Sequence, residues 1–425
     1  MSLPFLAALP TSFIPTGAQG VIAFILILLA LVLIHEFGHF LAAKAFGIKV
    51  LEFGVGFPPK AKSWKFGETE YSINWLPIGG FVRLLGEEDP TDPRSLAAAT
   101  RGKRLAVMFA GVFMNLVLAI ILLSIGFMVP RTRSLSLAQV NDIAVDSPAY
   151  CADVDGTLRD GRVPTSGLSE SSQAAKLDTC RTLYGSASAQ GLQPGDLIME
   201  VEGRDVKNTG ELIYANRLHL GETQTWTISR GGSTLIARVY ARWHPPAEQG
   251  PTGIRVGAPS TCSDVDAEGK AIGCTLLYPY TEREWYAPWQ AFPKGVQALW
   301  DTVILTKNEL QVRFGGGGGG GVSADQPAFS GPVGIASQTS DLVKAEGWRP
   351  LIELAALLSL NLAFFNVLPI PMLDGGRILF VFIEILRGGK RIAPEREAMV
   401  HMVGFALMMA AVVIVTYFDV ARLVS

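Results

Sequence analysis

Four stretches of the chain are apolar for long enough to cross a bilayer, which takes about 20 residues in a helix. The segments between them alternate in polarity or are rich in glycine, serine and aspartate. The predicted spans are Gly20–Ala43, Arg104–Val129, Leu351–Leu386, which is interrupted in its middle, and Ala398–Tyr417. This pattern predicts a polytopic α-helical membrane protein with four transmembrane helices and a large segment between the second and third.

Composition agrees with this fold class. The chain has 425 residues, a formal net charge of −2 and 49% hydrophobic residues, which is too apolar for an ordinary soluble protein and too mixed for spans alone. The weak net charge gives no indication of nucleic acid as a partner. No lysine or arginine precedes Lys44, whereas a secretory signal peptide needs a basic amino-terminal region. The first span is therefore expected to be a retained helix.

Basic residues beside the spans predict the orientation, because cytoplasmic loops carry an excess of lysine and arginine. One cluster precedes the second span and another fills the loop between the third and fourth: Arg101, Lys103, Arg104, Arg387, Lys390, Arg391 and Arg396. Both loops are therefore placed in the cytoplasm. The two termini and the segment from about Pro130 to Trp348 are then extracytoplasmic. Arg131 and Arg133 argue against this orientation, but they are outnumbered.

All four cysteines lie in the predicted external segment, at Cys151, Cys180, Cys262 and Cys274. An even number of cysteines in an oxidising compartment favours disulfides. Short loop closure favours the pairs 151–180 and 262–274, although four cysteines allow three connectivities. Free thiols are the open alternative.

The first span contains an unusual polar pattern, because His35-Glu36-Phe37-Gly38-His39 follows an unbroken apolar run. Histidines at i and i+4 fall on one face of a helix, where both can bind a single zinc ion. Glu36 lies beside the open coordination position, where hydrolysis needs a general base. Ionisable side chains in an apolar span are costly, so they usually mark function. The pattern predicts a metalloprotease site inside the membrane.

The third span contains a candidate for a further zinc ligand. Pro369 and Pro371 each remove a backbone donor, which predicts a break in the helix. Irregular backbone at membrane depth is tolerated only where it is buried in protein or lines a wet cavity, and Asp374 follows this break directly. The first and third spans are both predicted to run from outside to inside. His35, His39 and Asp374 therefore fall near the cytoplasmic ends and can meet at one depth.

These motifs resemble the site-2 protease family of intramembrane zinc metalloproteases, and within it the bacterial regulator of sigma-E protease type. The resemblance is carried by HExxH at His35–His39 and by NxxPxPxLDGG at Asn366–Gly376. Shorter matches cover most of the chain and lie at Phe53–Pro58, Gly79–Leu84 and Gly331–Ala336. Ala110–Asn115 resembles the second-span motif but lacks its usual proline, which bears on packing and not on the metal site.

The resemblance implies Zn2+ as the cofactor, His35, His39 and Asp374 as its ligands, and Glu36 as the catalytic base. It also implies that Asn366 holds the substrate backbone near the metal. A structural cap for backbone groups freed by the two prolines is the alternative role for Asn366.

The implied activity is hydrolysis of peptide bonds within the transmembrane segments of single-pass proteins in a bacterial plasma (inner) membrane. Such substrates, for example anti-sigma factors or signal-peptide remnants, are first shortened outside by an upstream site-1-type protease. A catalytically idle scaffold is the alternative from another functional class. A zinc carrier would need more polar residues along several spans than this chain has.

The other segments predict further modules. Residues 44–103 are expected to form a β-rich, re-entrant hairpin region at the cytoplasmic side, which can hold a substrate extended. Residues 130–245 resemble one extracytoplasmic PDZ-like α/β domain with an insertion at about 150–188. In it, Leu197, Met199 and Val201 alternate as in a half-buried strand, and Glu202-Gly203 suits a tight turn.

Residues 246–348 are expected to form an extracytoplasmic connector. It contains an amphipathic, partly helical stretch at Thr281–Asn308 that Pro288 and Pro293 interrupt, followed by a flexible linker at Gly315–Gly321. Residues 349–425 contain the last two spans. Within the spans, Asn115 is expected to make a helix-to-helix hydrogen bond, and His401 is expected to lie at the membrane interface.

Overall fold

The computed structural model describes residues 16–87, 89–144, 147–155, 191–246, 249–261, 264–265, 271–272, 275–276, 280–314, 331–346, 348–390 and 392–424. The chain divides into two compact units. We call residues 1–129, 286–299 and 327–425 the membrane unit, and residues 130–285 and 300–326 the sheet unit. Each unit contains its own hydrophobic core.

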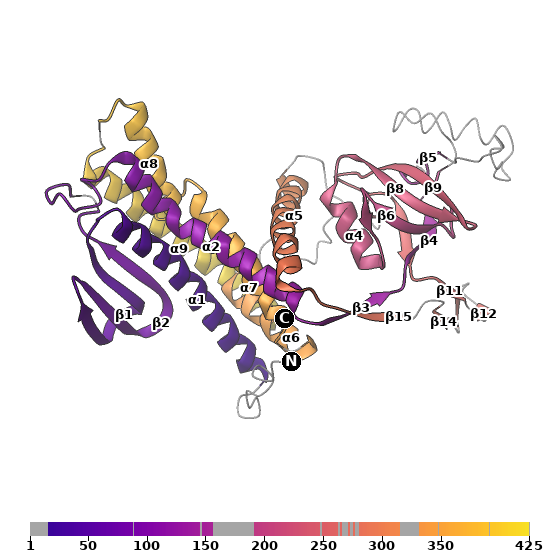
Figure 1. The fold of residues 1–425 in the computed structure, drawn as a ribbon, viewed down its shortest axis with the longest axis horizontal. Coiled ribbons are helices and arrows are strands. Elements are labelled where there is room, and N and C mark those ends of the chain that lie inside the picture. The colour runs from indigo at the N-terminus through magenta and orange to yellow at the C-terminus, as the bar shows by residue number, and fades with distance from the viewer. Residues whose placement is uncertain are drawn as a thin grey trace. The chain divides into compact units, whose positions relative to one another are not determined.

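The membrane unit is built mainly of helices (Figure 1), namely α1 (Thr16–Ala45), α2 (Arg101–Met128), α6 (Pro332–Glu346), α7 (Pro350–Val367), α8 (Asp374–Leu386) and α9 (Pro394–Val424). Among the described residues, four helices are long and apolar enough to cross a membrane: α1, α2, α7 and α9. α1, α2 and α9 coincide with the first, second and fourth predicted spans, and α7 covers the first half of the third. The predicted break in the third span is confirmed, because α7 ends at Val367 and α8 begins at Asp374.

Small residues let the helices of the membrane unit approach closely. A Cβ atom on Gly38 of α1 would lie 2.4 Å from the carbonyl oxygen of Ala110 on α2. On the other side of α2, the hydroxyl of Ser359 on α7 donates to the carbonyl of Asn115 at 2.9 Å. Close backbone approach and interhelical hydrogen bonds are the usual source of helix association in lipid. α2 therefore lies between α1 and α7.

The predicted β-rich segment forms a hairpin of β1 (Val50–Phe66) and β2 (Thr69–Leu84), which lies beside α1 (Figure 1). A two-residue turn joins the strands, and its Gly67 has a φ of 59°. The hairpin curls strongly, so that Glu52 pairs both with Glu70 and with Arg83. The curl brings the end of β2 next to the amino-terminal part of β1, close to α1.

The sheet unit contains an antiparallel sheet in the order β10-β4-β6-β8-β9-β5, with β7 paired to β6. Its elements are β4 (Ala138–Ile143), β5 (Asp153–Asp155), β6 (Leu197–Val201), β7 (Arg204–Asp205), α4 (Thr209–Leu218), β8 (Thr223–Arg230), β9 (Ser233–Tyr240) and β10 (Ile254–Gly257). Trp226, Ile198 and Leu212 are the largest side chains of its core, and all three are fully buried. The sheet is therefore packed around an aromatic centre.

The predicted alternation in β6 is wrong. Ile198 and Val201 are fully buried, whereas the Met199 side chain is 40% exposed. The reason is a shift in the pairing of β6 with β8 between Ile198 and Glu200, since a bulge moves the following side chains to the other face. The predicted turn is confirmed, because Glu202 and Gly203 have φ values of 49° and 71°, as a two-residue hairpin turn requires.

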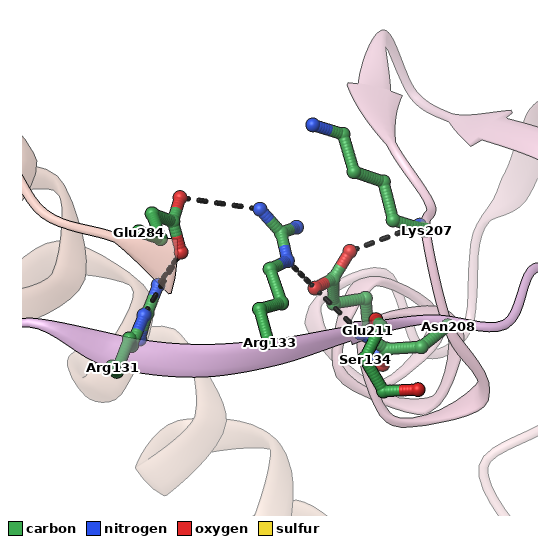
Figure 2. A network of polar contacts seen from close by, with 7 residues as sticks. All are labelled: Arg131, Arg133, Ser134, Lys207, Asn208, Glu211 and Glu284. Atoms are coloured by element: carbon green, nitrogen blue, oxygen red, sulfur yellow. Dashed lines mark hydrogen bonds and ion pairs between the residues drawn. The ribbon is translucent and has the colours of Figure 1, made fainter. Parts of the chain in front are cut away.

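A two-stranded ribbon of β3 (Arg131–Leu135) and β15 (Tyr280–Glu284) also belongs to the sheet unit. Figure 2 shows the Arg133 side chain between two carboxylates, those of Glu284 at 3.2 Å and Glu211 at 2.5 Å. Glu211 also accepts the backbone N–H of Lys207, and the Asn208 side chain accepts the backbone N–H of Glu211 at the start of α4. The network therefore joins the ribbon to the amino terminus of α4. Shorter strands are β11 (Ser260–Thr261), β12 (Asp264–Val265), β13 (Ala271–Ile272) and β14 (Thr275–Leu276).

The expected interruption of the connector helix is also wrong, because α5 (Pro288–Phe314) continues through Pro293. Pro288 stands at the first position of the helix, where its missing N–H costs nothing, and Pro293 removes only one hydrogen bond. In the part of α5 that belongs to the sheet unit, Asp301 accepts two hydrogen bonds from Arg204, at 2.7 and 2.8 Å. Burial and this carboxylate raise the pKa of the Tyr214 hydroxyl, which donates to Asp301.

Cys151 is the one cysteine among the described residues, and it is disulfide-bonded. Its partner lies outside the described residues, as do Cys180, Cys262 and Cys274. The two pairings therefore stay predictions. Most of the predicted insertion and the Gly315–Gly321 linker also lie outside the described residues.

Candidate active site

The three predicted zinc ligands come together in the membrane unit. His35 and His39 lie one turn apart on α1, and Asp374 is the first residue of α8. The Asp374 Oδ2 atom is 2.9 Å from His35 Nε2 and 3.1 Å from His39 Nε2, and the two Nε2 atoms are 3.1 Å apart. Both histidines are buried. Residues separated by more than 330 positions in the chain thus form one cluster.

The donor set of this cluster fits zinc. Tetrahedral zinc takes imidazole nitrogen and carboxylate oxygen at about 2.0–2.2 Å, which places the ligand atoms roughly 3.3 Å apart. The observed separations of 2.9–3.1 Å are close to that spacing. Two histidines and one carboxylate are also a known set of a catalytic zinc site, in which a fourth position is left for water or substrate.

The hydrogen bond made by the outward ring nitrogen of His39 fixes which of its two nitrogens faces the cluster. His39 Nδ1 is 2.7 Å from the carbonyl oxygen of Val107 on α2. A carbonyl oxygen only accepts, so Nδ1 carries the proton and Nε2 keeps a lone pair directed at the cluster. Such hydrogen bonds to the outward nitrogen orient metal-binding histidines generally.

Asn115 of α2 plays the corresponding part for His35. It is fully buried, and its side-chain amide lies 3.2 Å from His35 Nδ1. With the nitrogen of the amide toward His35, the Asn115 Oδ1 atom is buried without a partner among the described residues. Exchanging the amide oxygen and nitrogen, which are nearly indistinguishable in shape, lets Oδ1 accept from Nδ1–H. Zinc binding through Nε2 requires that orientation.

The sequence therefore predicted a helix-to-helix hydrogen bond of Asn115 but not its partner. A lone amide in an apolar span was the available signal. Gly111, one turn earlier on α2, belongs to the Ala110–Asn115 motif, but its contact with the histidines was not predicted. A Cβ atom there would lie 2.5 Å from His39 Nε2 and 2.7 Å from His35 Nε2. α2 can pass over the cluster only because this position has no side chain.

Glu36 follows His35 directly on α1. Its Oε2 atom accepts the backbone N–H of Val82, on β2, at 3.0 Å. The hairpin thus contacts the side chain expected to act as the base.

Close backbone contacts and ion pairs fix the position of α8, and with it Asp374. A Cβ atom on Gly375 would lie 2.0 Å from the carbonyl oxygen of Leu368, so the start of α8 packs directly on the broken segment. At the other end of α8, Glu384 accepts from Arg104 of α2 at 2.6 Å, and both side chains are less than 10% exposed. α8 is therefore tied to α2 as well as to the break.

Asn366 lies in the last turn of α7 and is buried. Its side chain makes no hydrogen bond within the described residues. The alternative role, capping of backbone freed by the prolines, therefore has no partner group in that part of the chain.

A buried cluster of two imidazoles and a carboxylate, with a further glutamate beside it, defines the site of a metal-dependent hydrolase among membrane-spanning helices. The profile of peptidase family M50 matches residues 23–411. The chain therefore belongs to peptidase family M50, the site-2 protease family.

Curated relatives align with this chain over nearly their whole length. A putative zinc metalloprotease of Clostridium perfringens is 30% identical, over 92% of this chain and 95% of the relative. The zinc metalloprotease RasP of Geobacillus kaustophilus is 27% identical, over 95% of this chain and 98% of the relative. The regulator of sigma-W protease RasP of Bacillus subtilis is 29% identical, over 95% of this chain and 98% of the relative. The protein is thus a zinc metalloprotease with Zn2+ as its cofactor.

Proposed function

We propose that the protein hydrolyses peptide bonds within the transmembrane segments of single-pass membrane proteins already shortened outside. The observation that carries this proposal is the convergence of His35, His39 and Asp374 beside Glu36 in helices of transmembrane length. In this proposal the first three residues hold zinc, and Glu36 is the catalytic base. Anti-sigma factors are the first substrate class to test, because one relative is named a regulator of sigma-W protease.

The ion held by these ligands supplies Lewis acidity toward a water molecule and a peptide carbonyl. Glu36 takes a proton from the attacking water at a carboxylate oxygen and later gives it to the leaving amine nitrogen. The N–H of Val82 holds Oε2 of this carboxylate, which leaves Oε1 for the proton. Burial of the cluster among apolar helices excludes bulk water, so the electrostatic interactions inside the site are stronger.

The hairpin supports a way of presenting the substrate. A transmembrane substrate is helical, and its carbonyl groups are satisfied internally. Pairing to a sheet edge would hold a segment of it extended, and β2 reaches Glu36 through Val82. In this proposal Asn366 holds the substrate backbone beside the metal, for which its side-chain amide, without a hydrogen bond among the described residues, is suited.

The proposed placement in a bacterial plasma membrane follows the basic residues. His35 and His39 lie in the half of α1 nearest to Lys44, and their partner Val107 lies near Arg101 on α2. The charge rule assigns these ends to the cytoplasm. The sheet unit is then extracytoplasmic. Its β10 stands at the end of the strand order, so a PDZ-like domain could add a peptide strand there. That strand would be the end left by the upstream protease.

The test is cleavage of a tagged single-span substrate without its external domain, by the full chain in liposomes. Glu36→Gln keeps the histidines but removes the base. Glu395→Gln, at an exposed position of α9, is the matched control. We expect cleavage by the wild type and the control and none by Glu36→Gln. Equal cleavage by Glu36→Gln would refute the role of Glu36. With zinc bound, failure of all three to cleave a panel of substrates would favour the scaffold.

A further inference from the structure

The segment before Asp374 has an unusual backbone. Between α7 and α8, Pro369 and Pro371 have no N–H to donate. Met372, two residues before Asp374, has a φ of 82°. Residues with a Cβ rarely adopt this region, and they keep it only where the surroundings impose it. Part of the reason is local, because the N–H of Leu373 donates to the carbonyl of Ile370 at 3.2 Å. This bond closes a turn with Pro371 at its second position and Met372 at its third, where a type II turn has a positive φ.

A further contact on this turn comes from α9. The backbone N–H of Met372 donates to His401 Nδ1 at 2.8 Å. One turn further along α9, Gly404 packs on the same segment, since a Cβ there would lie 2.3 Å from the Pro371 Cβ. The His401 ring also lies 5.5 Å from the ring of Phe380 on α8. His401 thus contacts both the broken segment and the helix that begins with Asp374.

The other described packing of α9 lies mainly at its far end, where Asp419 and Val415 meet the start of α6. Gly404 and Asp419 are its only buried residues among those whose burial is described. Asp419 accepts the N–H of Gly334 at the start of α6, far along the helix from His401. On the metal-binding side, His401 and Gly404 of α9 contact the broken segment, and Glu397 of α9 interacts electrostatically with Arg377 of α8.

We propose that His401 is a positioning residue for Asp374. As acceptor for the Met372 N–H, it keeps the broken segment in the conformation that presents the Asp374 carboxylate to the histidine pair. This inference rests on the proposed role of Asp374 as a zinc ligand and extends it to a residue that contacts neither metal nor substrate. The interfacial position expected from the sequence does not account for the hydrogen bond.

Three substitutions separate the hydrogen bond from simple packing. His401→Asn places an amide oxygen where Nδ1 stands, whereas His401→Gln places it where Nε2 stands. His401→Phe keeps the ring beside Phe380 but has no acceptor. Met402→Leu changes the neighbouring side chain, which is 66% exposed, and serves as the control.

The measurement is zinc affinity of the full-length protein in lipid nanodiscs, by competition with a chelator, together with its thermal unfolding. We expect His401→Phe and His401→Gln to weaken zinc binding by about 10-fold or more, as loss of groups that orient metal ligands does. His401→Asn and Met402→Leu should bind as the wild type does. The unfolding midpoints should differ less than the affinities.

Wild-type affinity of both His401→Phe and His401→Gln would overturn the proposal, as would equal losses in His401→Asn and His401→Gln. If His401→Phe does not fold, the Asn and Gln pair alone decides. Zinc affinity does not depend on peptide hydrolysis, so this test can succeed or fail independently of the cleavage assay with Glu36→Gln.

Discussion

The zinc cluster has two sides that are built differently. The histidine side is one regular helix, α1, packed on a second helix, α2, that supplies the partners of both outward ring nitrogens. The aspartate side begins in a break with two prolines and a left-handed Met372, and its position depends on α2, α7 and α9 together. A ligand on a regular helix is placed by periodicity, whereas a ligand after irregular backbone is placed by its neighbours.

The largest expected effect concerns the support of the aspartate side. Glu384→Ala leaves Arg104 as a buried charge without its carboxylate, because the two side chains are 2.6 Å apart and both are buried. Breaking a buried pair in this way costs about 3–5 kcal/mol. We expect a loss of that size in the free energy of unfolding, measured in detergent or by trapping of the unfolded state in lipid.

The control for Glu384→Ala is the double variant with Arg104→Met, which removes both charges and should recover most of the loss. If the double variant is no more stable than Glu384→Ala, the pair is not what holds α8. Zinc affinity should fall in the single variant as well, since α8 carries Asp374.

The histidine side has its own sensitive position. Gly111→Ala would place a methyl group 2.5 Å from His39 Nε2, so α2 or the ligands must move by a substantial fraction of an ångström. Misplacement of that order costs about 100-fold in activity. The cleavage assay and the zinc competition should both show the loss. Gly102→Ala, on the same helix with nothing within 4 Å of its Cβ, should behave as the wild type. An equal loss in Gly102→Ala would show that contact of the new methyl group with the histidines is not the cause.

The two sides also differ in how much the sequence could predict. The histidine side followed from the i, i+4 spacing in an apolar run, and Asp374 followed from the prolines that break the third span. Neither Gly111 nor the partner of Asn115 could be predicted, because which face of α2 meets α1 depends on packing. His401 could not be assigned for the same reason. It lies on a different helix from Met372, and no spacing relates them.

The fold outside the cluster shows the same limit. Apolar length predicted the four spans, and the turn at Gly67 agreed with the predicted hairpin. The errors arose where one local rule was followed too strictly. Pro293 does not end α5, because a long helix can lose one hydrogen bond. The burial of β6 is shifted by a bulge, which strict alternation cannot include.

A smaller effect should come from Asn115→Ala. This substitution removes the group that holds the outward nitrogen of His35, and losses of this kind weaken metal binding by about 10-fold. Ser359→Ala is the control, because Ser359 bonds the backbone carbonyl of Asn115 and not its side chain. We expect the control to keep its zinc affinity. If both variants weaken zinc binding equally, the packing of α2 on α7 is the cause, and Asn115 does not orient the histidine.

The smallest expected effect tests whether the two contacts of α9 are independent. Asp419→Asn keeps an acceptor for the Gly334 N–H but removes the negative charge at the amino terminus of α6, where the Asp419 side chain is buried. A charge in such a position stabilises a helix by about 0.3–2 kcal/mol. The free energy of unfolding should fall by an amount in that range. Zinc affinity should stay at the wild-type value, because His401 and Gly404 contact the segment near Met372 at the other end of α9. A fall in zinc affinity with Asp419→Asn would mean that α9 acts as one rigid element, and that the aspartate side depends on the whole fourth span rather than on one hydrogen bond.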